Sequence, residues 1–134
     1  MKSLVERQHA STRVSEVEDR ACSAFFVVRD TATDTVGPMY AKLDGEWHRF
    51  YLDAGLLFWR QGIAPDEEDD LLDGDEYFDL FDFLRLDGAR IETVKMDKGL
   101  LTIRFETGAH VEVFCRMPED RARFRRLESG PALA

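Results

Sequence analysis

Residues 100–113 read LLTIRFETGAHVEV, and no other stretch shows the pattern of a β-strand pair as clearly. Apolar residues alternate with polar ones on both sides of a glycine-containing turn: Leu101, Ile103, Phe105, Val111 and Val113. A period of two places the apolar side chains on one face of a strand and the polar side chains on the other. The stretch therefore predicts two neighbouring antiparallel strands that have one buried and one solvated face.

The surrounding sequence extends this pattern into two meanders, over residues 24–60 and 89–117. In the second meander, Lys98-Gly99 and Gly108-Ala109 supply the turns. In the first, Asp44-Gly45 lies between two apolar runs and favours a tight hairpin. We expect the two meanders to share one core: Phe26, Val28, Phe50, Leu57, Ile91, Leu101, Ile103, Phe105, Val111 and Val113.

Three other segments show helical spacing. The apolar residues of segment 11–21 recur at i, i+3 and i+7, which predicts a helix there. Segment 119–128 follows a proline and carries Phe124 and Leu127 three positions apart, which predicts a final helix. Segment 75–84 fits a short helix by its spacing and a strand by its aromatic density, and we expect the helix. The predicted class is α+β, a mostly antiparallel β-sheet built from two meanders with flanking N- and C-terminal helices.

The chain has 134 residues, a length typical of one domain, and we expect a single domain over residues 1–134 with residues 1–10 frayed. The N-terminal residues lack the apolar stretch of a signal peptide, and no apolar run approaches the ~18–20 residues of a membrane helix. We therefore expect a cytoplasmic protein without membrane attachment. In that compartment Cys22 and Cys115 are expected to remain reduced thiols.

Charge is distributed unevenly along the chain. The formal net charge is −9, from 18 basic and 27 acidic residues. No lysine or arginine occurs between Arg60 and Arg85, and ten acidic residues lie in that interval, so the other acidic residues nearly balance the basic ones. The negative charge thus belongs to one segment, and we expect an acidic loop over residues 61–76. A net charge of this sign argues against a nucleic-acid partner.

Motifs of catalysis are missing from the sequence. It has no G-x-S-x-G, no glycine-rich phosphate loop, no H-E-x-x-H and no cysteine–histidine spacing typical of zinc ligands. Glu46 with His48, and His110 with Glu112, are spaced so that each pair lies on one face of a strand, where a carboxylate can tune a general base. A solvated charge pair is the commoner outcome. We predict no enzymatic activity, no metal and no cofactor; the alternative is a small enzyme or ligand-binding domain that uses His48 or His110.

Two charged clusters also suggest ligands. Aligning Gly74 with the glycine of a calcium-binding EF-hand loop places Leu71 and Leu80 at ligand positions, which excludes that motif but leaves open a weak divalent-cation site on the clustered carboxylates. Near the C-terminus five arginines face three acidic residues, and we expect them to pair with the acidic loop rather than bind RNA: Arg116, Arg121, Arg123, Arg125 and Arg126.

Residues 86–94 read LDGARIETV and residues 101–113 read LTIRFETGAHVEV. Together they resemble the pattern L-x-G-x-x-I-x-x-V … L-x-I-x-F-x-x-G-x-x-V-x-V of small bacterial domains, several of which are immunity proteins of polymorphic toxin systems. The resemblance implies a cytoplasmic, non-enzymatic inhibitor that docks on a secreted toxin. It transfers no binding residues, because such proteins bind through divergent surfaces.

The acidic loop is the feature from which we predict function. A dense carboxylate cluster on a nearly neutral body steers a cationic partner, and neighbouring aromatic side chains supply the apolar anchors of an interface. We expect a protein-binding module, an immunity-type inhibitor that docks on a basic toxin domain through Asp66, Glu67, Glu68, Asp69, Asp70, Asp73, Asp75 and Glu76. The alternatives are a loop that only aids solubility and a homo-oligomeric protein with no catalytic role.

Overall fold

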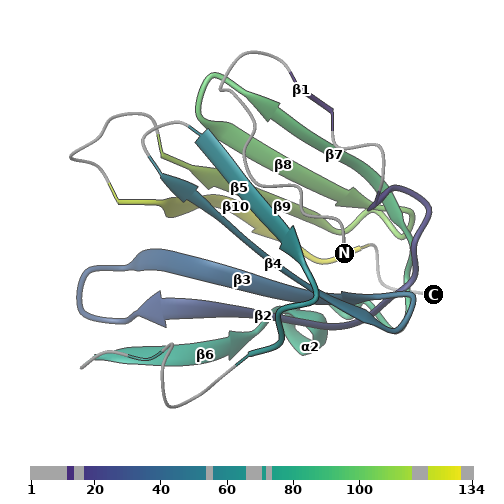
Figure 1. Ribbon diagram of the computed structural model, residues 1–134, viewed down its shortest axis with the longest axis horizontal. Coiled ribbons are helices and arrows are strands. Elements are labelled where there is room, and N and C mark those ends of the chain that lie inside the picture. Colours follow the sequence, from purple (N-terminus) through teal and green to yellow (C-terminus); the bar gives the residue numbers. More distant parts are fainter. Residues whose placement is uncertain are drawn as a thin grey trace.

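The computed structural model describes residues 12–13, 17–53, 56–65, 71, 74–115 and 121–130. Within this part, the strands form two five-stranded antiparallel sheets, with the order β5-β4-β3-β2-β6 in sheet A and β1-β7-β8-β9-β10 in sheet B (Figure 1). The elements are β1 (Thr12–Arg13), β2 (Cys22–Asp30), β3 (Thr35–Leu43), β4 (Glu46–Asp53), β5 (Leu56–Gln61), β6 (Asp75–Asp79), α2 (Leu80–Phe83), β7 (Ile91–Asp97), β8 (Leu100–Phe105), β9 (His110–Phe114) and β10 (Arg123–Glu128).

The predicted hairpins are confirmed. Asp44 and Gly45 have φ angles of 48° and 84°, and Lys98 and Gly99 have 50° and 83°. Two successive positive φ angles match the right-handed twist of the strands that such a turn joins, and glycine adopts them without steric cost. The two turns connect β3 to β4 and β7 to β8.

The two sheets share one hydrophobic core. Phe25 of β2 contacts the ring of Phe50 in sheet A at 6.0 Å and that of Phe105 in sheet B at 6.3 Å. Backbone hydrogen bonds also join the sheets, because Val36 N–H donates to the carbonyl of Ala122 at 2.8 Å. Eight predicted core residues are confirmed as members of this core: Phe50, Leu57, Ile91, Leu101, Ile103, Phe105, Val111 and Val113.

The predicted faces of β2 are wrong. Phe25 and Val27 belong to the shared core, so the alternation turns Phe26 and Val28 to the outer face of sheet A. Val28 is nevertheless buried there, while Phe26 is half-buried and contacts Trp47 and Tyr77. An uninterrupted apolar run gives no period from which the inward residues can be chosen.

The α+β class is also wrong, because the protein is mostly β and the described residues form one helix of four residues, α2. The helix predicted over 11–21 is not formed in the part that is described. Asp19 has a φ of 67° and donates its N–H to Ile91 at 2.7 Å, and Ala21 forms a bridge with Arg90. The backbone groups of this segment therefore bond to sheet B instead of to a helical turn.

The helix predicted over 119–128 is wrong for a different reason. Residues 123–128 form β10, an edge strand paired with β9, while residues 119–120 lie outside the described part. A register shift between Phe124 and Arg126 inserts an extra residue, so Phe124 and Leu127 both pack against the core although they are three positions apart. A β-bulge thus reproduces the spacing of a helix.

Segment 75–84 divides between the two structures that its sequence allowed. Asp75–Asp79 is strand β6, paired with β2, and Leu80–Phe83 is one turn of helix. Asp79 is the N-cap, because its carboxylate accepts the N–H of Asp82 at 3.1 Å. The expected helix over the whole segment is therefore wrong.

Candidate functional site

The acidic loop connects opposite edges of sheet A. Strand β5 ends at Gln61 on one edge and β6 begins at Asp75 on the other, with β4, β3 and β2 between them. At about 4.8 Å per strand, the two edge strands are roughly 19 Å apart. Six of the eight predicted binding residues lie outside the described part of the chain: Asp66, Glu67, Glu68, Asp69, Asp70 and Asp73.

The other two predicted residues, Asp75 and Glu76, begin β6, and Gln61 still belongs to β5, so the predicted loop bounds of 61–76 are wrong at both ends. Glu76 is half exposed and forms an ion pair with Arg29 at 3.0 Å. The guanidinium of Arg29 also lies 4.2 Å from the centre of the Phe78 ring. Asp75 is half-buried and lies opposite Asp30 in the register of β2 and β6. These two residues therefore place acidic groups at the β6 edge of sheet A, where Arg29 partly neutralises Glu76.

An aromatic pocket of about 450 Å³ lies on the outer face of sheet A. It is lined by Phe26 of β2, Trp47 of β4, Tyr77 of β6, and Ala64 with Pro65 after β5. The ring centre of Phe26 lies 6.4 Å from those of both Trp47 and Tyr77. Ala64 and Pro65 precede the acidic residues and Tyr77 follows them, so both ends of the loop line this pocket.

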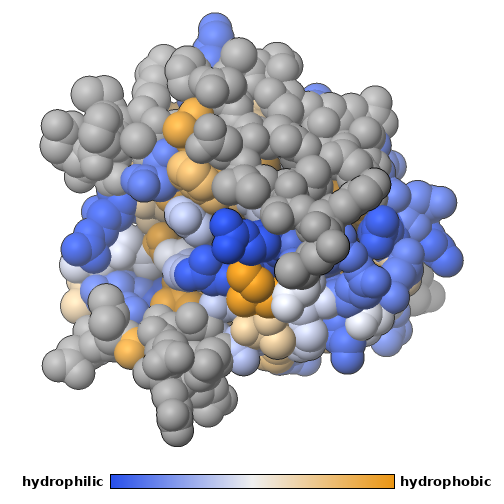
Figure 2. Space-filling model, in the orientation of Figure 1, coloured by the Kyte–Doolittle hydropathy of each residue, from blue (hydrophilic) through white to orange (hydrophobic). Residues whose placement is uncertain are grey.

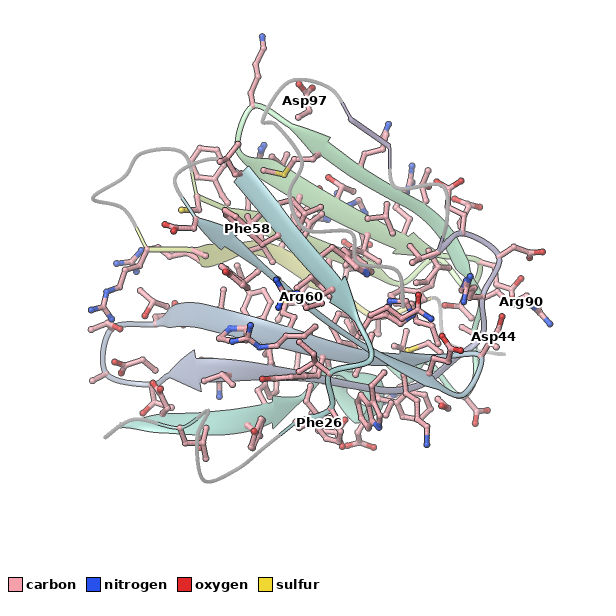
Figure 3. All side chains as sticks on the ribbon, in the orientation of Figure 1. Phe26, Asp44, Phe58, Arg60, Arg90 and Asp97 are labelled. Carbon is pink, nitrogen blue, oxygen red and sulfur yellow. The ribbon has the colours of Figure 1, made fainter. Side chains whose placement is uncertain are left out.

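A second, smaller cleft of about 110 Å³ lies on strands β4 and β5 of the same face. It is lined by Arg49, Tyr51, Phe58, Trp59 and Arg60. Figure 3 shows Phe58 and Arg60 on β5, and Phe26 beside the lower strands of sheet A. Inward and outward residues alternate along β4 and β5, so Tyr51 points away from the core while its two neighbours in sequence point toward it. This alternation is the feature of the sequence that indicates an outward face here. The alternation alone does not reveal the cleft, because the cleft depends on the register between β4 and β5.

His48 does not pair with Glu46 but lies in the interior. Its ring is 2% exposed, and its Nδ1 accepts a hydrogen bond from the indole Nε1 of Trp59 at 3.0 Å. Because Nδ1 accepts, the neutral ring carries its proton on Nε2, which is buried without a partner. Burial lowers the pKa of His48, nearby Arg20 lowers it further, and Glu46 acts weakly in the opposite direction.

His110 and Glu112 come together on the outer face of sheet B. His110 Nε2 lies 2.9 Å from a carboxylate oxygen of Glu112, although the angle is not that of a hydrogen bond. Arg125 of β10 approaches the other oxygen of Glu112 at 3.6 Å. The arrangement is a partly buried charge cluster that can hold a histidine in a fixed position. Neither of the clefts described above is lined by His110 or His48.

The described C-terminal arginines bond within the fold rather than to the described acidic residues of β6. Arg126 donates two hydrogen bonds to Glu128, at 2.7 and 2.9 Å, and Arg123 donates to the carbonyl of Thr33 at 3.0 Å. Arg121 is exposed, and Arg116 lies outside the described part.

Other reactive groups offer no site in the described residues. Cys22 and Cys115 are buried thiols that form no disulfide, and burial raises the pKa of Cys22 to about 12, so its nucleophilic thiolate is suppressed. No group of three or more histidine, cysteine, aspartate or glutamate side chains in the described part is arranged to hold a metal ion.

No helix in the described part is long and apolar enough to cross a membrane. Comparison of the chain with protein-family models, with curated proteins and with solved structures found no match.

Proposed function

We propose that this chain is a non-enzymatic binding module that docks on a basic protein through the acidic loop between β5 and β6, the first residues of β6 and the aromatic pocket on sheet A. The observation that carries the proposal is the position of the loop's two ends. Ala64 and Pro65 at one end and Tyr77 just beyond the other line the same pocket. The densest run of carboxylates in the chain is therefore attached on both sides to an apolar recess.

The acidic loop and the aromatic pocket contribute differently to binding: the loop affects the rate of association and the pocket the rate of dissociation. Clustered carboxylates raise the rate of encounter with a cationic protein and give little lasting affinity where they are exposed. Aromatic side chains in a recess supply the buried contacts that slow dissociation. The pocket volume of about 450 Å³ lies within the range of ~300–1,000 Å³ that encloses an organic group. It is large enough to receive an aromatic or long aliphatic side chain of the partner.

The partner class follows from the charge and from the resemblance to immunity proteins. A basic toxin domain, such as a nuclease, carries the opposite charge to the loop, and an immunity-type inhibitor would meet it in the cytoplasm of the producing cell. A nucleic-acid partner is disfavoured by the net charge of −9.

Capture from the native host tests the proposal with four forms of the chain as bait. They are the wild type, Asp69→Lys/Asp70→Lys in the loop, Trp47→Ala in the pocket, and a control, Glu92→Lys/Asp97→Lys. Glu92 and Asp97 are exposed on β7 of sheet B, so the control makes the same charge change away from the loop. We expect a basic protein to be retained by the wild type and the control and lost from the other two.

The folding of each variant is checked by near-ultraviolet circular dichroism before capture. Identical sets of retained proteins on all four baits would contradict the proposal and leave a loop that only aids solubility. Light scattering of the purified chain tests the homo-oligomeric alternative, because that alternative requires a mass of at least two chains of 15.4 kDa each.

A further inference from the structure

Strands β4 and β5 place two arginines side by side on the outer face of sheet A. Arg49 and Arg60 are direct partners in the antiparallel register. Like charges that face each other across two strands destabilise a sheet unless an anion lies between them. No carboxylate of the described residues lies within ion-pair distance of either guanidinium, although the chain has 27 acidic residues. Within the part of the chain that the structure describes, the pair therefore has no counterion.

Both arginines line the cleft of about 110 Å³, and its other side chains are aromatic. The rings of Tyr51 and Phe58 stack across the two strands, with centres 5.1 Å apart and planes inclined by 13°. Arg49 is held in place from behind, because its Nε donates to the hydroxyl of Tyr40 at 3.0 Å. Its guanidinium also lies 5.3 Å from the centre of the Tyr51 ring. A fixed guanidinium has terminal N–H groups available for a ligand without further loss of entropy.

We propose that Arg49 and Arg60 bind the phosphate group of a small organic phosphate whose planar ring lies against Tyr51 and Phe58, as in a nucleoside monophosphate. Arginine pairs recognise phosphate through parallel charge-assisted hydrogen bonds, and aromatic side chains stack on nucleobases of any sequence. The cleft is smaller than pockets that enclose a whole ligand, so it accepts the phosphate while the ring covers the neighbouring aromatic side chains.

Phe58 and Arg60 are the outward residues of β5, because Leu57 and Trp59 are buried between and beside them, and both are labelled in Figure 3. Figure 2 shows strongly hydrophilic and hydrophobic residues side by side in the middle of the face that is turned to the reader. Arg60 is exposed, while Arg49, Tyr51 and Phe58 are each partly buried. The site is separate from the aromatic pocket, with which it has no lining residue in common.

Calorimetric titration of the full chain with adenosine monophosphate, adenosine and inorganic phosphate tests this site. Three variants accompany the wild type: Arg60→Gln, Phe58→Leu, and the control Arg104→Gln, which removes an exposed arginine from the outer face of sheet B. We expect the monophosphate to bind more tightly than either of its parts. Arg60→Gln should weaken monophosphate binding about tenfold, because one of two charged contacts is lost. Phe58→Leu should weaken the monophosphate but leave inorganic phosphate unchanged.

Three results would overturn this inference. The first is an equal loss of affinity for the monophosphate in Arg60→Gln and Arg104→Gln. The second is binding of adenosine that is as tight as binding of the monophosphate. The third is binding of a single-stranded oligonucleotide when the monophosphate does not bind at millimolar concentration. Because the titration involves no protein partner, its failure leaves the proposed docking function untouched, and the failure of that function leaves this site untouched.

Discussion

The outer faces of the two sheets differ although both cover the same core. On sheet B, His110, Glu112 and Arg125 form one charge cluster, and Arg126 pairs with Glu128. On sheet A, outward aromatic and cationic residues line two clefts, and two of these residues are facing arginines with no described carboxylate beside them. Charges that are already paired need no ligand, whereas the two facing arginines of sheet A are groups that an anionic ligand would satisfy.

The largest expected effect is a loss of stability on replacing a core phenylalanine. It tests whether the two sheets differ only on their outer faces and share one core. Phe50→Ala in sheet A and Phe105→Ala in sheet B should each lower the free energy of unfolding by ~3–5 kcal/mol, because both rings are buried against Phe25. The outward replacement Tyr51→Ala should have a much smaller effect, about 1 kcal/mol. Urea unfolding followed by tryptophan fluorescence and by circular dichroism measures all three. If Phe105→Ala left the fluorescence transition of sheet A unchanged, the two sheets would be separate folding units.

A second effect compares aromatic side chains on the two outer faces. Trp47→Ala should weaken binding of the basic partner by about 2 kcal/mol or more, since a tryptophan in a recess is the typical anchor of an interface. Phe114→Ala, which removes a 36% exposed ring from sheet B, should leave affinity unchanged. Surface plasmon resonance with the captured partner measures both. Equal losses would mean that the docking surface is not on sheet A.

The buried histidine predicts how stability depends on pH. The folded pKa of His48 lies below its unfolded value near 6.5, so below about pH 6.5 the unfolded chain binds more protons than the folded chain. The free energy of unfolding should therefore fall as the pH is lowered, by at most about 1.4 kcal/mol per pH unit from this group. His48→Gln keeps an acceptor for the Trp59 indole but does not titrate. Urea titrations between about pH 5 and 8, where histidine titrates, should show that the free energy of unfolding of this variant depends less on pH than that of the wild type. An unchanged pH dependence would mean that groups other than His48 cause it.

The smallest expected effect is on sheet B. Glu112→Gln removes the charge that His110 and Arg125 share, and we expect a loss of ~1 kcal/mol or less in stability, because surface ion pairs contribute little. Binding of the basic partner should not change. A large loss of binding would give the histidine cluster the role that we assign to sheet A.

The sequence predicted the parts of the fold in which a period of two is visible. Strands β8 and β9 and the turns at Asp44-Gly45 and Lys98-Gly99 follow from alternation and turn chemistry alone. The C-terminal helix was predicted wrongly because the bulge in β10 sets Phe124 and Leu127 three positions apart. A bulge depends on pairing with β9, and a single strand's sequence does not reveal that pairing.

The candidate site was predicted only in part. Charge counting finds the acidic loop, but the aromatic pocket forms from residues of β2, β4 and β6 that are far apart in sequence. Their proximity depends on the order of strands in sheet A, which local patterns do not encode. The outward position of Phe26 was hidden by the continuous apolar run of β2, and the facing of Arg49 and Arg60 depends on the register between β4 and β5.

The rate of association with the captured basic partner tests the central claim most directly. Stopped-flow measurements would compare the wild type, Asp69→Lys/Asp70→Lys and the control Glu92→Lys/Asp97→Lys at increasing salt. We expect wild-type association to slow steeply with salt, and the loop variant to associate about tenfold more slowly at low salt with a weaker salt dependence. The control should stay close to the wild type. Equal rates and equal salt dependence in all three proteins would contradict the claim that the acidic loop of sheet A guides binding.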